Sequence, residues 1–86
     1  MFTRTAKVAS KVGLHARPAA QLAQAAADEN IDITISFEGE EADAASILEL
    51  MSLGAMHGDE VTLSTDDAAG EAALDRLVAL IESDLD

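Results

Sequence analysis

Residues 31 to 37 carry the clearest hydrophobic pattern in the chain, because apolar and polar side chains alternate there at every position. A period of two is typical of a β-strand with one buried face. Three further segments alternate less clearly: residues 61 to 64, residues 2 to 8 and, most weakly, residues 40 to 45. The pattern therefore predicts three strands and indicates a fourth.

A second kind of pattern predicts the helices. Between residues 68 and 85 large apolar residues recur at spacings of three and four, as on one face of an amphipathic helix: Leu74, Leu77, Val78, Ile81 and Leu85. Residues 16 to 28 are rich in alanine and predict another helix, with one apolar face made of Ala19, Leu22, Ala23 and Ala26. Ser46 and Glu49 form a capping box that predicts a short third helix, which Gly54 ends.

The predicted order of elements is strand, helix, strand, weak strand, short helix, strand, helix. This order indicates an α+β fold in which the strands form one layer and the helices another. A chain of 86 residues is long enough for one compact domain and too short for two. No repeat, linker or low-complexity tract divides it, so we expect a single domain over residues 1–86.

The composition excludes several classes of protein. Seventeen acidic residues against five basic ones give a net charge of −12, which would repel nucleic acid and anionic membranes. No stretch approaches the ~18 apolar residues of a membrane span, and the N-terminus lacks the apolar core of a signal peptide. The absence of cysteine agrees with a reducing compartment. We therefore expect a cytoplasmic protein.

The acidity has a further implication for the host. Dense negative charge destabilises a fold at low salt, and the Debye length falls to ~3 Å at molar ionic strength, which removes the repulsion. We therefore expect a salt-adapted, halophilic source. The alternative is an acidic protein from an ordinary host.

Candidate chemistry lies in the segment from Gly13 to Ala19. A proline is tolerated in the first turn of a helix, so Pro18 places the start of the alanine-rich helix just before it. With His15 at the N-cap, the backbone N–H groups of Ala16 and Arg17 would face the space beside its ring. The guanidinium of Arg17 would add a fork of donors, so this segment predicts an anion site.

His15 is the candidate nucleophile at that site. A neutral imidazole has one ring nitrogen with a free lone pair, which can attack phosphorus. The alternative is that His15 only caps the helix and that Arg17 is a solvated surface charge. Phosphoryl transfer is favoured because four of the five cations lie in the first 17 residues, around His15: Arg4, Lys7, Lys11 and Arg17.

The segment from Gly13 to Ala19 resembles the active-site signature of the HPr family, the histidine-containing phosphocarriers of the phosphoenolpyruvate-dependent sugar phosphotransferase system. The resemblance continues through residues 46 to 55, Gly58 and residues 61 to 63, and so covers essentially the whole chain. It implies an open-faced β-sandwich, with a four-stranded antiparallel sheet covered on one face by three helices in the order βαββαβα.

The resemblance also implies a function. His15 would accept a phosphoryl group from phosphorylated enzyme I on Nδ1 and donate it to a sugar-specific IIA domain, while Arg17 steadies the phosphate. Such a protein is a stoichiometric carrier that supports sugar uptake, rather than a stand-alone enzyme. We expect a monomer without metal or cofactor. The implied docking surface for both partners is apolar and consists of Ala16, Ala20, Ile47, Leu48 and Met51.

Two features depart from the family pattern. Positions where many members carry lysine are occupied here by Gln21, Gln24, Ala27 and Ala45. Docking is therefore expected to depend more on apolar contact than on electrostatic steering. Ser46 matches a regulatory phosphorylation site of some relatives, but its capping role and the carboxylates of Asp43 and Glu49 disfavour that modification.

Other functions remain as alternatives. A regulatory module of the same fold could dock partners according to its phosphorylation state, although pure docking has no use for an activated imidazole. A small hydrolase with His15 as base is disfavoured, since so few polar groups converge in this chain. His57 has no second His or Cys for a metal site and is expected to be solvated, and the scattered acidic pairs are expected to be surface charges.

Overall fold

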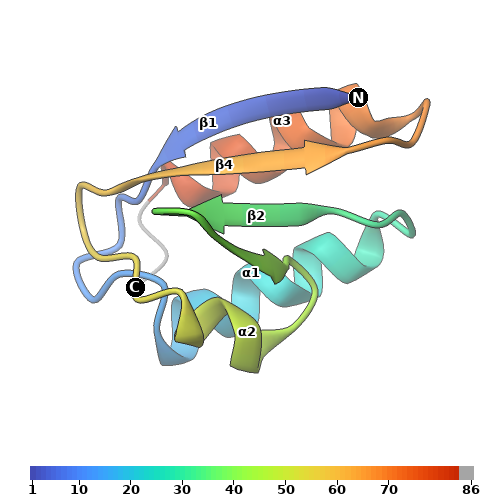
Figure 1. Ribbon diagram of the computed structural model, residues 1–86. Helices are drawn as coiled ribbons and strands as arrows, with labels where there is room; N and C mark the ends of the chain where they lie inside the picture. The colour runs from blue at the N-terminus through green and yellow to red at the C-terminus, as the bar shows by residue number, and fades with distance from the viewer. Residues whose placement is uncertain (84–86) are drawn as a thin grey trace.

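The computed structural model describes residues 1–83 and shows seven elements in the predicted order (Figure 1). Their bounds are β1 Phe2–Lys7, α1 Ala16–Asp28, β2 Thr34–Phe37, β3 Glu40–Asp43, α2 Ile47–Ser52, β4 Glu60–Thr65 and α3 Gly70–Ile81. The α+β organisation is therefore confirmed. Leu85, the last residue of the predicted apolar stripe of α3, lies outside the described residues.

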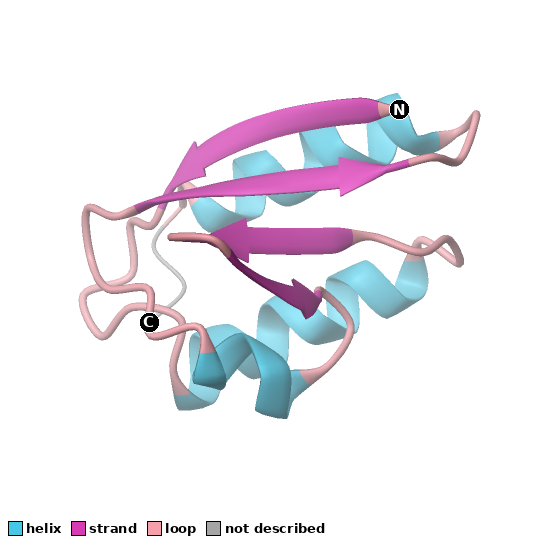
Figure 2. Ribbon diagram, in the orientation of Figure 1, coloured by secondary structure: helices cyan, strands magenta, loops and turns pink. Residues whose placement is uncertain are grey.

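The four strands form one antiparallel sheet in the order β1-β4-β2-β3 (Figure 2). The three helices lie on the same side of this sheet, which confirms the open-faced sandwich. The first strand of the chain is thus an edge strand, and β4 runs between β1 and β2. No helix within residues 1–83 is long and apolar enough to cross a membrane.

The core lies between the sheet and the helices. Fully buried side chains come from both layers and include Leu22, Ile35, Leu50, Leu63, Leu74 and Leu77. Burying one such side chain is worth about 1.5–3 kcal/mol. The predicted face of α1 is buried as a whole, and the closest neighbours of this helix are α2 and α3.

Strand β2 is shorter than the alternation predicts. Side-chain burial alternates through Ile31, Ile33 and Ile35, but pairing with β3 and β4 begins only at Thr34. The backbone carbonyl of Asp32 accepts a 2.7 Å hydrogen bond from the Thr65 hydroxyl instead of a strand N–H. The prediction of a strand from residue 31 was wrong because burial of alternate side chains does not require a backbone ladder.

The capping box of α2 is half formed. The Ser46 hydroxyl accepts a hydrogen bond of 3.3 Å from the Glu49 N–H, as predicted. The Glu49 carboxylate, however, accepts from the backbone N–H of Asp43 at 3.0 Å rather than from Ser46. The helix ends at Ser52 with Leu53 as its C-cap, and Gly54 follows with φ +74°, a conformation that glycine adopts without strain.

Candidate functional site

His15 occupies the predicted position at the N-cap of α1. Its backbone is extended, with φ −134° and ψ 150°, and its side chain makes no capping hydrogen bond. The side chain is exposed to solvent. The imidazole therefore has no capping role, which argues against the alternative that His15 serves only to start the helix. An exposed ring at a helix N-terminus is free to meet an incoming group.

The residue after His15 has an unusual backbone conformation. Ala16, the first residue of α1, has a φ of +44°, in the left-handed region that side chains with a Cβ rarely adopt. Such a conformation costs on the order of 1–2 kcal/mol per residue. Strain of this kind persists only where the surrounding contacts impose it, and it gathers at functional sites.

Close contact with a neighbouring turn holds the loop before His15. Gly13 has a φ of +72°, and a side chain there would overlap the backbone of Ala55 and Met56. The next residue, Leu14, is buried, and its N–H donates a 2.9 Å hydrogen bond to the carbonyl of Ala55. Two contacts with the turn at Ala55 and Met56 therefore fix the loop immediately before His15: the close approach of Gly13 and the hydrogen bond from Leu14.

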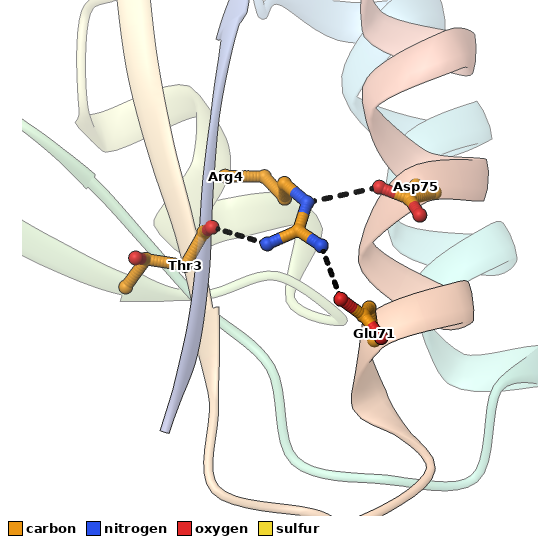
Figure 3. Close-up of polar contacts among 4 residues, drawn as sticks. All are labelled: Thr3, Arg4, Glu71 and Asp75. Carbon is orange, nitrogen blue, oxygen red and sulfur yellow. Dashed lines mark hydrogen bonds and ion pairs between the residues drawn. The ribbon is translucent and has the colours of Figure 1, made fainter.

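Arg17 is the guanidinium available to an anion beside His15. Its side chain is exposed and forms no hydrogen bond or ion pair with another side chain among residues 1–83. The other two arginines form ion pairs: Arg4 with Glu71 and Asp75 (Figure 3), and Arg76 with Glu29. The prediction that Arg4 belongs to a cationic group around His15 is therefore wrong, because carboxylates of α3 hold it.

The acidic residues avoid the segment that carries His15. All seventeen lie at position 28 or later, so neither the loop before His15 nor the first three turns of α1 bears a carboxylate. An approaching phosphate would meet no negative charge on this segment. The net charge of the whole chain therefore does not describe the surroundings of His15.

Exposed apolar side chains accompany the site. Leaving Met1 aside, the large apolar residues with the greatest exposure are Leu48 at 79%, Met56 at 56%, Val12 at 49% and Ile47 at 44%. Ala16 and Ala20 of the predicted docking surface are exposed as well. Met51 differs, because it is half-buried and packs against the core.

Val12 and Met56 were not assigned to the docking surface from the sequence. Val12 and Met56 belong to neighbouring segments, because Gly13, which follows Val12, lies against the Met56 backbone. The sequence does carry a signal for them: each is a large apolar residue in a segment that is predicted to be neither helix nor strand. Both residues lie in loops, beside Gly13 and between Gly54 and Gly58.

Other candidate residues occupy unremarkable surroundings. Ser46 is half-buried, and the carboxylates of Asp43 and Glu49 both accept backbone N–H groups near it. His57 is exposed. Within residues 1–83 no group of three or more His, Cys, Asp or Glu side chains could hold a metal ion.

Comparison with known proteins agrees with this geometry. The family model for the PTS HPr component phosphorylation site matches residues 2–83. The chain belongs to the HPr family. The phosphocarrier protein HPr of Streptomyces coelicolor is 39% identical over 87 residues, which cover 100% of this chain and 94% of the relative.

Solved HPr structures share the fold over nearly the whole length. The crystal structure of HPr-C-His from Thermoanaerobacter tengcongensis superposes with a TM-score of 0.89 at 40% identity, covering 96% of this chain and 93% of that one. Crh, the catabolite repression HPr of Bacillus subtilis, superposes with a TM-score of 0.70 at 35% identity, covering 96% and 99%. The chain is therefore similar both to HPr and to an HPr relative named for repression.

Proposed function

We propose that this HPr-family protein carries a phosphoryl group on His15, which it receives from phosphorylated enzyme I and passes to a sugar-specific IIA domain. One observation carries the proposal: His15 presents a solvent-exposed imidazole, free of any capping bond, at the N-terminus of α1. Arg17, two residues further on, pairs with no side chain among residues 1–83.

The proposed chemistry follows from the groups at this helix end. A neutral ring nitrogen, Nδ1 by family resemblance, attacks phosphorus, and a P–N bond forms as the bond to the donor breaks. Phosphate oxygens then accept hydrogen bonds from the N–H groups of Ala16 and Arg17 and from the Arg17 guanidinium. In the second step the acceptor's nucleophile attacks phosphorus, and the imidazole leaves with the bonding electron pair. Each phosphoryl group gained is passed on, so the protein acts as a stoichiometric carrier.

The proposed docking surface surrounds His15 and serves both partners in turn. It comprises the predicted residues Ala16, Ala20, Ile47, Leu48 and Met51, extended by Val12 and Met56. We define these seven residues as the apolar docking surface. The exposure of Val12, Ile47, Leu48 and Met56 supports the proposal, because large exposed apolar side chains are typical of interaction sites.

The setting of this carrier is part of the proposal. Sugar uptake through a phosphotransferase system requires a carrier in the cytoplasm, and the net charge of −12 supports a salt-adapted host. Electrostatic steering is weak at high ionic strength, so apolar contact would supply most of the docking energy there.

A second candidate function is regulatory docking governed by the phosphorylation state. The similarity to Crh of Bacillus subtilis favours it. His15 distinguishes the two functions, because a module that only docks partners needs no nucleophile beside an anion site. Phosphorylation at Ser46 is disfavoured for the same chain, since Asp43 and Glu49 place negative charge beside it.

Phosphorylation in vitro tests the proposal. The protein is incubated with enzyme I and phosphoenolpyruvate and then analysed by intact-mass spectrometry at neutral or alkaline pH. We expect a gain of one phosphate that is lost in acid, is absent in His15→Ala and is retained in His57→Ala, the matched control on the other histidine. Adding a IIA domain should then remove the phosphate. Absence of the gain, with an enzyme I that phosphorylates its own HPr, would contradict the proposal.

A further inference from the structure

A peptide group of the turn before β4 links the His15 loop to a carboxylate. Leu14, directly before His15, donates its N–H to the carbonyl of Ala55 at 2.9 Å. The N–H of Met56 belongs to the same peptide group as that carbonyl. It donates to the carboxylate of Asp59, with 2.9 Å between the nitrogen and Oδ2. One peptide group therefore binds the His15 loop through its oxygen and Asp59 through its nitrogen.

The geometry of this peptide group determines what Asp59 does. The Ala55–Met56 peptide is trans and planar, so its oxygen and its N–H point in opposite directions. By binding the N–H, the Asp59 carboxylate orients the carbonyl toward Leu14. A hydrogen bond to a carboxylate is stronger than one between neutral groups, and it polarises the peptide so that the carbonyl becomes a better acceptor. Asp59 thus strengthens the anchor of the His15 loop through the peptide group between them.

The backbone of Asp59 is itself fixed by the end of β1. Val8, a buried residue directly after β1, donates its N–H to the Asp59 carbonyl at 2.9 Å and accepts the Gly58 N–H at 2.8 Å. The Asp59 N–H donates to the Met56 carbonyl at 3.0 Å and closes a four-residue turn. Gly58 has a φ of +88°, which suits the third position of a type II turn. The half-buried Asp59 side chain therefore extends from a well-fixed backbone.

We propose that Asp59 is a positioning residue for phosphoryl transfer at His15, a role that rests on the proposed function. Without the carboxylate, the Met56 N–H turns to water and the carbonyl beside it is no longer fixed toward the loop. Ala16, directly after His15, keeps its strained φ of +44° only while the surrounding contacts impose it. The imidazole is then correctly placed for attack on phosphorus for less of the time, which lowers the rate of the chemical step.

Substitutions at Asp59 test the proposal through the kinetics of phosphorylation by enzyme I. Asp59→Ala removes the acceptor for the Met56 N–H, and we expect kcat to fall about three- to tenfold while KM changes less than about twofold. Asp59→Asn keeps a side-chain oxygen that accepts the same N–H, so its kcat should lie within about twofold of that of the unmodified protein. Rates are expressed per folded molecule, with the folded fraction measured by circular dichroism.

Asp67 provides the matched control. Its carboxylate also accepts a backbone N–H within a turn, that of Ala69 at 2.8 Å. This turn lies just before α3, at the opposite end of β4 from Asp59. Asp67→Ala therefore removes the same charge and the same kind of hydrogen bond from another part of the molecule. Its kcat and KM should both stay within about twofold of those of the unmodified protein.

Amide hydrogen exchange tests the same link without a measurement of activity. Exchange of the Leu14 N–H reports the opening of its hydrogen bond to Ala55, whereas the amides of β4 report the stability of the sheet. In Asp59→Ala, the protection of Leu14 should fall at least about threefold more than that of the β4 amides. In Asp59→Asn and Asp67→Ala, Leu14 should lose no more protection than β4.

Several outcomes would overturn the positioning role of Asp59. In the kinetics these are an unchanged kcat in Asp59→Ala, a defect confined to KM, or equal losses in Asp59→Ala and Asp67→Ala. If Asp59→Asn is as slow as Asp59→Ala, the hydrogen bond to Met56 is not the cause. In hydrogen exchange, equal loss of protection at Leu14 and in β4 would break the proposed link. Absence of any phosphate on the unmodified protein would instead contradict the proposed function itself, and the positioning role would fall with it.

Discussion

The backbone N–H of Leu14 donates a 2.9 Å hydrogen bond to the carbonyl of Ala55, which joins the His15 loop to the turn after α2. This bond brings two halves of the proposed docking surface together, Val12 on one side and Met56 on the other. The two segments lie so close together that Gly13 has no room for a side chain. The position of His15 therefore depends on Gly13.

Gly13→Ala should disturb both folding and phosphorylation. Alanine at φ +72° is strained, and its Cβ would overlap the backbone of Ala55 and Met56. We expect a loss of at least about 2 kcal/mol in the free energy of unfolding, together with slower phosphorylation of the folded fraction. Urea unfolding and the initial rate of phosphorylation measure the two effects.

Gly39→Ala provides the matched control for this change. Gly39 has a similar φ of +84°, but a Cβ there meets no atom within 4 Å. It should cost only the conformational penalty, about 1 kcal/mol, and leave phosphorylation intact. Equal losses in the two variants would show that close approach at Gly13 is unimportant.

Leu48→Asp should impair transfer more than any change at Lys11. Leu48 is 79% exposed, so the substitution places a charge in the docking surface without disturbing the core. We expect a fall of about tenfold or more in kcat/KM for phosphorylation by enzyme I, since a buried unpaired charge at an interface is costly. Ile47→Asp should act in the same direction, whereas Met51→Asp would also destabilise the fold, because Met51 packs on the core.

The comparison variants are Lys11→Ala and Ala72→Asp. Ala72 is exposed on α3, so Ala72→Asp adds the same negative charge away from His15. Both should transfer at nearly the rate of the unmodified protein. A larger defect in Lys11→Ala than in Leu48→Asp would mean that steering, and not apolar contact, dominates docking.

The helices were predictable because their signals are local. The bounds of α1 match the predicted 16 to 28, since Pro18 marks the first turn and the alanines favour helix throughout. The position of His15 at the N-cap follows from the same signal. The start of β2 was missed because backbone pairing depends on partners elsewhere in the chain, which side-chain alternation does not report.

Features that depend on distant contacts could not be predicted. Arg4 is near His15 in sequence, yet it binds residues of α3 that follow it by 67 and 71 positions. The left-handed φ of Ala16 has no sequence signal either, because alanine ordinarily avoids that region. Counting the cations near His15 in the sequence therefore overestimates the positive charge around it in the folded protein.

Acidification should weaken the contact between α1 and α3. Arg76 binds Glu29 through two hydrogen bonds of 2.5 and 2.8 Å, and these bonds lower the pKa of Glu29. A carboxyl group whose pKa is lower in the folded state stabilises the fold above its unfolded pKa, and this contribution disappears as pH falls through the folded value. Arg76→Gln should therefore destabilise the protein at pH 7 and have progressively less effect as the solution is acidified below the ordinary carboxyl range.

A double-mutant cycle with Glu29→Gln isolates this pair from the general effect of removing a cation. The coupling between the two substitutions in the free energy of unfolding should be favourable at pH 7 and vanish in acid. A coupling that persists unchanged in acid would show that the interaction does not depend on ionised Glu29.

Salt should stabilise the protein strongly. With a net charge of −12, the folded chain repels itself in dilute buffer, and molar KCl screens that repulsion to distances of ~3 Å. We expect the thermal midpoint to rise by several degrees or more between dilute buffer and 2 M KCl, as follows from a gain of at least about 1 kcal/mol in a domain of this size. The same titration near pH 4 serves as the control, because protonation of carboxylates removes part of the charge and should shrink the salt effect. A midpoint that is equal in dilute buffer and molar KCl at neutral pH would contradict salt adaptation, while leaving the proposed role of His15 untouched.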